Sequence, residues 1–306
     1  RVQPWRGFLL GYAQVPVVAA MRGIALGGGC EIAVHCARRV AAMETYVGLV
    51  EVGVGLVPGA GGLTYIARRA AENAETSTGK DLLPFLTEGF TAAAMAKVGT
   101  SAIESRQLGY VLHSDLIVPH KDELLFVAIN EAKAMFAGGY RAPHKRLFPV
   151  AGRDGKATIL GSLVNMRDGG FISQHDFHIA SLIANVVTGG DVEAGPLVSE
   201  EYLMTLERQA FCALIVHPKT QERILGMLYT GKPVRNRRPR WPEHLECRMT
   251  NLVTYALTDG GATLAVDEGK ANAIGPRMQD TLNAALDRAE ADRALVVLTG
   301  RPRVFS

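Results

Sequence analysis

The feature that most constrains this chain is the glycine-rich run GIALGGGCE at residues 23–31, which follows a short apolar segment at residues 16–20. An apolar stretch of this length is typical of a buried strand. Consecutive glycines at the start of a helix let backbone amides approach a ligand closely and point their N–H groups toward it. The run therefore predicts a strand, a tight turn and a helix, with Glu31 in the first turn of that helix.

A second carboxylate follows at Glu51, just before another glycine-rich turn, VPGAGG, at residues 57–62. Both glutamates stand next to glycine-rich turns, so they can converge on one pocket. Paired carboxylates beside amides that stabilise an oxyanion are suited to adding or removing water and protons alpha and beta to a carbonyl. The spacing alone also allows a plain tight turn and a glutamate that serves the helix dipole.

Composition excludes several classes of function. Hydrophobic residues make up 48% of the 306 residues and charged residues 21%, as in an ordinary globular protein, which argues against disorder. A net charge of +3 gives no chain-wide case for nucleic acid or an anionic membrane. No run approaches the roughly 18 apolar residues of a membrane helix. The four cysteines form no CxxC pair, which favours a reducing, cytoplasmic compartment.

Alternating helix and strand patterns predict an α/β protein. Strands are expected at 116–118, 252–257, 262–266 and 294–298, and helices at 62–69, 81–107, 121–136, 199–216, 218–229 and 276–291. The glycines between residues 143 and 170 predict a loop-rich passage.

A composition break divides the chain near its C-terminal end. The segment RNRRPRWP at residues 235–242 holds four arginines and two prolines, which is poor material for a helix or strand. We expect an Arg/Pro-rich linker at 237–248, a solvated segment rather than an RNA contact. The resulting domains are 1–236 and 249–306. Because the chain stops soon after its last strand, we expect a fragment cut at both ends.

Residues 16–62 closely resemble the heart of the crotonase, or enoyl-CoA hydratase/isomerase, superfamily. The resemblance implies that Gly28 supplies the second oxyanion N–H, and that Glu31 and Glu51 are the two hydratase carboxylates, one activating water and the other handling the alpha proton. Having both favours hydration of a trans-2-enoyl-CoA over isomerase or thioesterase chemistry. The implied substrate-binding positions are Leu26, Gly27, Gly29, Pro58, Gly59, Lys270, Ala271 and Ala273.

The continuation to residue 236 resembles the C-terminal hydratase part of bacterial bifunctional 3-hydroxyacyl-CoA dehydrogenase/enoyl-CoA hydratases. The resemblance implies that the NAD-binding dehydrogenase part lies upstream. This chain holds no GxGxxG, so we expect no cofactor of its own, with CoA entering as part of the substrate. Residues 249–306 resemble instead the start of a second hydratase. There residues 267–274 match a CoA-gripping loop, and 296–300 a strand that leads to the first oxyanion donor.

The implied fold is a crotonase-like spiral of ββα units, incomplete, with a helical extension of its first part. We expect the C-terminal piece to fold back beside the N-terminal strands in a circularly permuted sheet, with Arg1 and Ser306 on the same side. The implied function is hydration in fatty-acid beta-oxidation, with an acyl-CoA thioester as substrate and a homo-oligomer as the assembly. The alternative is a catalytically incomplete chain that only binds acyl-CoA or partner subunits.

Two remaining motifs carry no expected chemistry. His175 and His178 flank Asp176, but no third ligand is evident at a suitable spacing, so we expect a solvated or capping role and no metal. Cys30 lies in the glycine-rich motif without a histidine base beside it, and we interpret it as a small buried residue.

Overall fold

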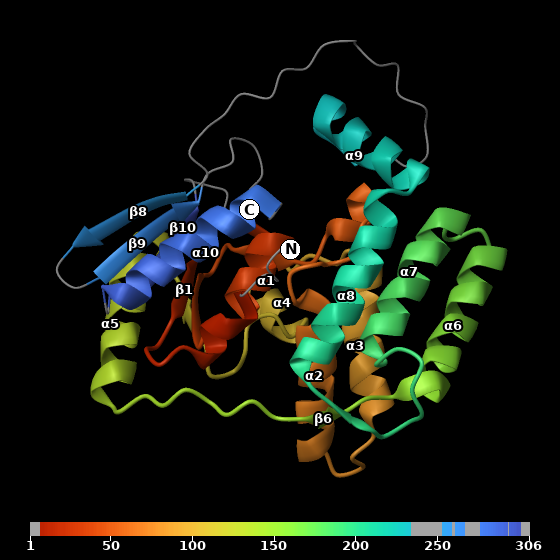
Figure 1. Cartoon of the computed structure of the whole chain (residues 1–306), viewed down its shortest axis with the longest axis horizontal. Coiled ribbons are helices and arrows are strands. Elements are labelled where there is room, and N and C mark those ends of the chain that lie inside the picture. The colour runs from red at the N-terminus through yellow and green to blue at the C-terminus, as the bar shows by residue number, and fades with distance from the viewer. Residues whose placement is uncertain (1–6, 234–252, 259–260, 267–275, 293, 301–306) are drawn as a thin grey trace. The chain divides into compact units, whose positions relative to one another are not determined.

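The structure, a computed structural model, describes residues 7–233, 253–258, 261–266, 276–292 and 294–300 (Figure 1). The chain divides into two compact units. Unit 1 comprises residues 1–48, 98–145 and 247–306, and unit 2 comprises residues 49–97 and 146–246. These units interleave along the sequence. The expected boundaries at 236 and 249, which follow the Arg/Pro-rich composition break, stay a prediction.

Unit 1 is built on a six-stranded sheet with the order β5-β3-β1-β10-β9-β8. Every adjacent pair is parallel except β8 and β9, which form an antiparallel edge. The strands are β1 (Val18–Met21), β3 (Arg38–Ala42), β5 (Leu116–Val118), β8 (Val253–Thr258), β9 (Gly261–Val266) and β10 (Leu295–Gly300). A separate parallel pair consists of β2 (Ile24–Leu26) and β4 (Tyr46–Gly48).

The C-terminal strands are an integral part of this sheet. In the register of β1 and β10, Val18 pairs with Val297 and Ala19 pairs with Leu298. The predicted fold-back of the C-terminal piece beside the N-terminal strands is therefore confirmed. The circular permutation itself stays a prediction, and Arg1 and Ser306 lie outside the described residues.

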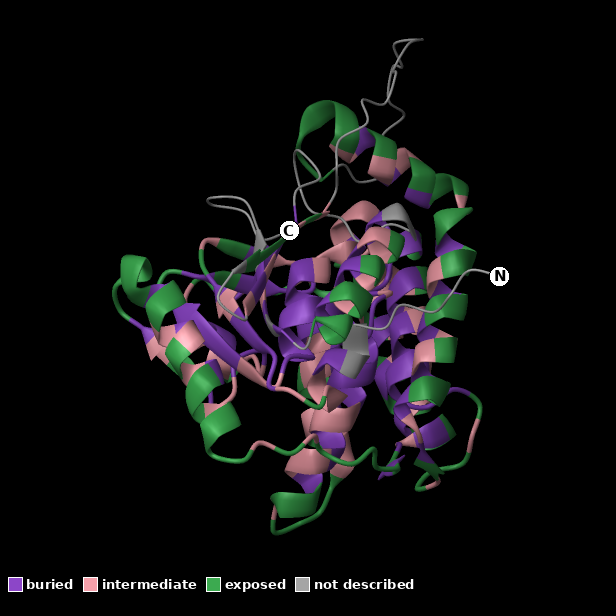
Figure 2. Ribbon diagram, turned by 60° about the vertical axis from the view of Figure 1, so that its left-hand side comes forward, coloured by how far each residue is buried: buried purple, intermediate pink, exposed green. Residues whose placement is uncertain are grey.

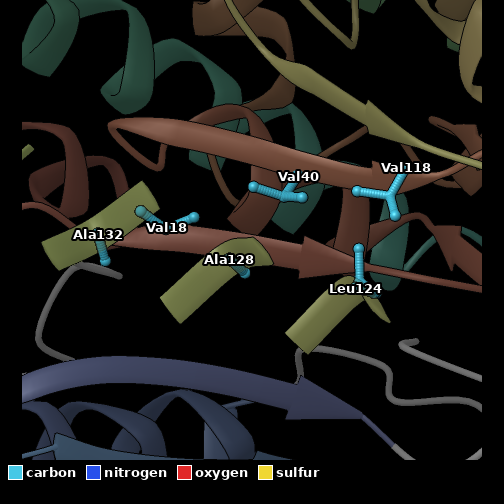
Figure 3. Packing of buried hydrophobic residues seen from close by; sticks show 6 residues of the cluster. All are labelled: Val18, Val40, Val118, Leu124, Ala128 and Ala132. Carbon is cyan, nitrogen blue, oxygen red and sulfur yellow. The ribbon is translucent and has the colours of Figure 1, made fainter. Parts of the chain in front are cut away.

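Helices cover the strands of unit 1. Leu124, Ala128 and Ala132, four residues apart on one face of α5 (Leu124–Ala137), pack against β1, β3 and β5 through Val18, Val40 and Val118 (Figure 3). The two alanines let the helix approach the strands closely. Figure 2 shows the strands as largely buried and the outer face of the neighbouring helices as exposed. The remaining helical elements of unit 1 are η1 (Gly7–Tyr12), α1 (Gly28–Val34), α4 (Ala102–Gln107), η3 (Lys121–Glu123) and α10 (Pro276–Ala291).

Unit 2 is mainly helical. Its elements are η2 (Glu51–Val54), α2 (Gly62–Thr76), α3 (Leu82–Ala94), β6 (Phe148–Pro149), α6 (Gly152–Asp168), α7 (Gln174–Val187), β7 (Leu197–Val198), α8 (Glu200–Ile215) and α9 (Pro218–Thr230). Phe148 of β6 and Val198 of β7 pair in a two-stranded ladder and share a core cluster with Ala67, Ala71 and Leu203 of the flanking helices. This confirms the helical region expected after the glycine-rich motifs.

Two secondary-structure predictions were wrong. The passage at 143–170 is not loop-rich, because α6 occupies 17 of its residues. Gly152 begins that helix at φ 60°, where a Cβ would lie 2.1 Å from the carbonyl oxygen of Glu193, so this glycine serves close backbone packing. The single helix expected over 81–107 is also interrupted, since α3 ends at Ala94 and Ala96 adopts a φ of 50° before α4 begins.

None of the helices in the described part of the chain combines the length and the apolar character that crossing a membrane requires.

Candidate active site

The glycine-rich turn of unit 1 joins β2 to α1. Gly27 is the N-cap of α1, with φ 57° and ψ −127°, and its N–H donates to the carbonyl of Gly48 at 2.8 Å. Gly28 is the first residue of the helix and is half-buried. An N–H at this position has no acceptor within its own helix and points along the axis, away from the helix body. The Gly28 N–H therefore has no acceptor within α1, and its role as an oxyanion donor stays a prediction.

Hydrogen bonds around the turn fix its path. Leu26 pairs with Gly48 in the β2–β4 ladder, and the N–H of Tyr46 donates to the carbonyl of Gly23 at 2.7 Å. Gly23 has a φ of 71°, a conformation that L-residues with side chains rarely adopt. Leu26 is half-buried and Gly29 is buried. The turn is thus held on both sides by paired backbone, so its amides are preorganised.

Glu31 lies in the first turn of α1 and is buried, with 3% of its surface exposed. Its backbone N–H donates to the carbonyl of Gly27 at 3.0 Å, the first hydrogen bond of the helix. Cys30 beside it is fully buried, which confirms its interpretation as a small core residue. Glu31 thus lies on the same short helix as Gly28 and is shielded from bulk water, and its role as a general acid or base stays a prediction.

Glu51 begins the 3₁₀ turn η2 in unit 2. Gly55 ends this turn in the left-handed conformation, at φ 85°, and its N–H bonds back to the carbonyls of Glu51 and Val52. Both carboxylate oxygens of Glu51 are shielded from solvent. The carboxylate group of Glu51 is therefore shielded, although the residue as a whole is half-buried, and it lies on a short element with a defined end.

The second glycine-rich turn is held by α8. Glu207, buried on that helix, accepts hydrogen bonds from the N–H of Gly61 at 2.8 Å and from the N–H of Thr64 at 3.1 Å. It thereby caps the N-terminus of α2 from a different helix. Pro58 is buried, and a Cβ added at Gly59 would lie 2.5 Å from Cδ2 of Phe211 on α8. Gly59 is thus required for this close approach.

Sequence reasoning missed Glu207, and it missed Arg223 on α9 as well. Both are buried charged residues on the inward face of a helix, at 1% exposure each. Glu207 follows Leu203 by four residues and precedes Ala210 by three, so it falls on the apolar stripe of α8. A charged residue at an inward position of an amphipathic helix is the sequence signal that would have found it.

The predicted site residues fall in three places. Gly28 and Glu31 belong to unit 1, whereas Glu51, Pro58 and Gly59 belong to unit 2. The convergence of the two carboxylates on one pocket stays a prediction. The remaining substrate-binding positions lie outside the described residues: Lys270, Ala271 and Ala273.

The histidine motif on α7 is only partly as expected. Asp176 forms a capping box with Ser173, which confirms the capping role. His175 is 2% exposed and bonds to Thr220 through Nε2 at 3.0 Å, so the expectation of a solvated imidazole was wrong for this residue, whereas His178 is exposed as expected. The ring stacks on His217, with centroids 4.5 Å apart. Among the described residues, no group of three or more His, Cys, Asp or Glu is placed to hold a metal ion.

A mainly parallel sheet, a glycine turn at the start of α1 and a buried glutamate in the first turn of that helix are consistent with the expected crotonase-type fold. Comparison with known proteins agrees, since residues 9–80 match the family model described as enoyl-CoA hydratase/isomerase. This part of the chain belongs to that family.

Relatives extend the similarity along the chain. A Bacillus subtilis protein described as a probable 3-hydroxyacyl-CoA dehydrogenase is 41% identical over 230 residues, which are 74% of this chain and 28% of that protein. The fatty acid oxidation complex subunit alpha of Colwellia psychrerythraea is 45% identical over 93 residues, 29% of this chain and 12% of that one. A short-chain-enoyl-CoA hydratase of Clostridium acetobutylicum is 51% identical over 53 residues, which are 17% of this chain and 20% of that protein. The matches thus span at most 28% of these relatives' own lengths.

Proposed function

We propose that this chain contributes to the hydration of trans-2-enoyl-CoA thioesters. The observation that carries the proposal is the burial of Glu31 in the first turn of the helix whose first N–H belongs to Gly28. A carboxylate and an oxyanion donor on one short element suit chemistry at the carbon atoms next to a thioester carbonyl. Glu51, the second buried carboxylate, supplies the other group that hydration needs.

In this mechanism the Gly28 N–H holds the thioester oxygen as that oxygen gains enolate character. One glutamate takes a proton from water, whose oxygen forms a bond to the beta carbon. The other glutamate delivers a proton to the alpha carbon, so the double bond is consumed and a 3-hydroxyacyl thioester results. Two carboxylates and an oxyanion donor are enough to balance the protons, and the chemistry involves no change of oxidation state.

Chain connectivity supports the participation of both carboxylates. The Gly28 turn is tied to the end of β4, because the Gly27 N–H donates to the Gly48 carbonyl. Glu51 follows Gly48 by three residues. An extended chain covers at most about 3.6 Å per residue, so the Cα atoms of Gly48 and Glu51 lie no more than roughly 11 Å apart. We take this limit on chain length as support for a role of both glutamates in the proposed reaction.

We further propose that the chain is the hydratase part of a bifunctional 3-hydroxyacyl-CoA dehydrogenase/enoyl-CoA hydratase of fatty-acid oxidation. The names of the Bacillus and Colwellia relatives support this assignment. NAD would then bind the dehydrogenase part and not this chain. A homo-oligomer in the cytoplasm is the assembly that we expect.

Hydration of crotonyl-CoA tests the proposal, followed by the loss of absorbance of the conjugated enoyl thioester. We expect turnover that falls on substitution Glu31→Gln and is retained on Glu44→Gln, since Glu44 is an exposed glutamate of the same unit. Binding of crotonyl-CoA without any turnover would support the alternative of a chain that only binds acyl-CoA, and would contradict hydration.

A further inference from the structure

Helix α9 contacts the turn that carries Glu51 through two side chains. Thr220 donates its hydroxyl proton to the carbonyl of Gly55 at 2.7 Å, and Arg223 donates from Nη1 to the carbonyl of Val52 at 3.3 Å. These two carbonyls belong to the 3₁₀ turn and to the residue that ends it. The backbone on the C-terminal side of Glu51 is therefore anchored by one helix at two points.

The arginine is itself fixed by a buried ion pair. Its side chain is fully shielded, and Nη1 lies 2.8 Å from Oδ1 of Asp176 on α7. Asp176 in turn is oriented by its capping box with Ser173. A buried ion pair loses much of its attraction to desolvation, and apolar residues of the same volume often stabilise a fold as well or better. A gain in stability is therefore a weak explanation for the presence of this ion pair. A better explanation is that the pair fixes the direction of the Arg223 guanidinium group.

The threonine belongs to a directed chain of hydrogen bonds. Its hydroxyl has a single proton, which goes to Gly55, so the contact with His175 at 3.0 Å requires Nε2 of His175 to be the donor. Burial, followed by the charge of Arg223, lowers the pKa of His175 to about 4. At neutral pH the ring is therefore uncharged, with its proton on Nε2. The order of donors runs from His175 through Thr220 to the turn.

Close packing leaves the turn little freedom to move independently of α9. Gly55 has a φ of 85°, and a Cβ at this position would lie 3.0 Å from Cα of Thr220 and 3.1 Å from Cδ of Arg223. The absence of a side chain brings the backbone of the turn directly against the helix. A shift of either Thr220 or Arg223 would therefore be transmitted to the backbone that carries Glu51.

We propose that Thr220 and Arg223 are positioning residues that hold the Glu51 carboxylate in the orientation for proton transfer. The inference rests on the proposed hydratase function and assigns to α7 and α9 a part in it. If this is correct, weakening these hydrogen bonds lowers the rate of the chemical step more than it lowers the affinity for the thioester. The reason is that the hydrogen bonds contact the backbone of the turn that carries Glu51 and not the substrate.

The test compares three threonine variants. Each variant is made in the 306-residue chain and also in a longer chain that contains these 306 residues. Thr220→Val removes the donated proton with little change in volume, and Thr220→Ser keeps the hydroxyl. The matched control is Thr230→Val, because Thr230 lies on the same helix, is exposed, and forms its hydrogen bonds near the helix end, with the carbonyls of Gly226 and Lys232 and with the N–H of Lys232. Backbone hydrogen exchange is measured on a peptide that covers residues 50–57, with a peptide from α3 as reference.

We expect Thr220→Val to speed exchange at residues 50–57 by about tenfold, equivalent to 1.4 kcal/mol of lost protection, with exchange in α3 unchanged. In an active protein, kcat should fall at least tenfold while KM changes less than twofold, with Thr220→Ser restoring both readouts. Unchanged exchange at residues 50–57 in Thr220→Val overturns the proposal. An equal loss in Thr230→Val overturns it too, since the effect would then be a general one of the helix.

A failure of the proposed function looks different. If the unsubstituted protein binds enoyl-CoA but never hydrates it, the kinetic comparison has no baseline, and a catalytic positioning role is excluded along with hydration. The exchange result then still reports whether α9 holds the turn. If the protein is active and Thr220→Val loosens the turn without lowering kcat, hydration stands and the positioning role is overturned. Arg223→Lys serves as a second variant, because it keeps the charge beside Asp176 and alters the geometry of donation.

Discussion

Val18 of β1 lies opposite Val297 of β10 in a parallel ladder, although the two residues come from opposite ends of the chain. The pairing places β10 between β1 and β9, in the interior of the six-stranded sheet of unit 1. Residues beyond the arginine-rich segment thus supply half of the strands in that sheet. Substitutions in β10 should consequently affect the stability of the N-terminal part that carries Gly28 and Glu31.

Leu298→Ala tests this dependence. Leu298 is 4% exposed, so its truncation should leave a cavity and lower the free energy of unfolding by about 2–5 kcal/mol. The matched control is Leu257→Ala on the edge strand β8, where the side chain is 47% exposed and the loss should be below about 1 kcal/mol. Urea unfolding followed by circular dichroism provides both values. Similar losses in the two variants would contradict the central position of β10.

The two glutamates should be catalytically essential wherever hydration of crotonyl-CoA is measured. Glu31→Gln and Glu51→Gln each remove a proton-transfer group while keeping its volume, and each should lower turnover by roughly a hundredfold or more. The measurement is kcat at saturating crotonyl-CoA, with circular dichroism as the check on folding. Near-normal turnover in either variant would remove that residue from the mechanism.

Stability should depend on pH through His175. Because the folded protein lowers the pKa of this imidazole from 6.5 to about 4, the unfolded chain binds more protons between these values. The free energy of unfolding should therefore fall as the pH is lowered from about 6.5 to 4, and it should be independent of this residue above that window. The pKa of His178 is also lowered by burial, and its contribution has the same sign.

Unfolding in urea at a series of pH values between 4 and 7 measures this dependence. His175→Gln keeps a donor for Thr220 without a titrating group and should flatten the slope. His120→Gln changes an imidazole that is 70% exposed and should leave the slope as it is. Identical slopes in the unsubstituted protein and His175→Gln would show that His175 does not cause the dependence.

Glu207 should stabilise the turn that leads into α2. Replacement by alanine leaves the buried N–H groups of Gly61 and Thr64 without this carboxylate, which should cost about 1–3 kcal/mol. Thermal unfolding of Glu207→Ala, with Glu88→Ala as the control at an exposed helical position, measures the effect. Equal midpoints in the two variants would mean that the cap contributes nothing to stability.

The bounds of some helices and strands of this fold could be predicted from local sequence patterns. The strand at 116–118 and the helix at 276–291 have the predicted bounds, because apolar periodicity and flanking turn residues mark their ends. The glycines of α6 misled the prediction, because Gly152 is needed for contact with the backbone of Glu193 rather than for a loop. A contact between distant segments is not visible in a local pattern.

The same reason separates the site residues that could be predicted from those that could not. Gly28, Glu31 and Glu51 lie in local glycine-rich sequence patterns, so the sequence alone proposes them as site residues, and their roles stay a prediction. Arg223 acts on Val52 and Thr220 on Gly55 across a long stretch of sequence, so only the folded chain reveals these contacts. Their single local sign is a polar residue on the inward face of α9.

The pairing of β1 with β10 also determines when β1 gains this neighbouring strand during synthesis. Ribosomes add on the order of 5–20 residues per second, so residues 295–300 are synthesised roughly 15–55 s after β1. During that interval one edge of β1 has no native neighbour and is open to pairing with other chains. The contact has a very large sequence separation, and contacts of that kind slow folding. Co-expression with a chaperone that shields strand edges should therefore raise the yield of this protein more than that of a hydratase whose neighbouring strands are made consecutively.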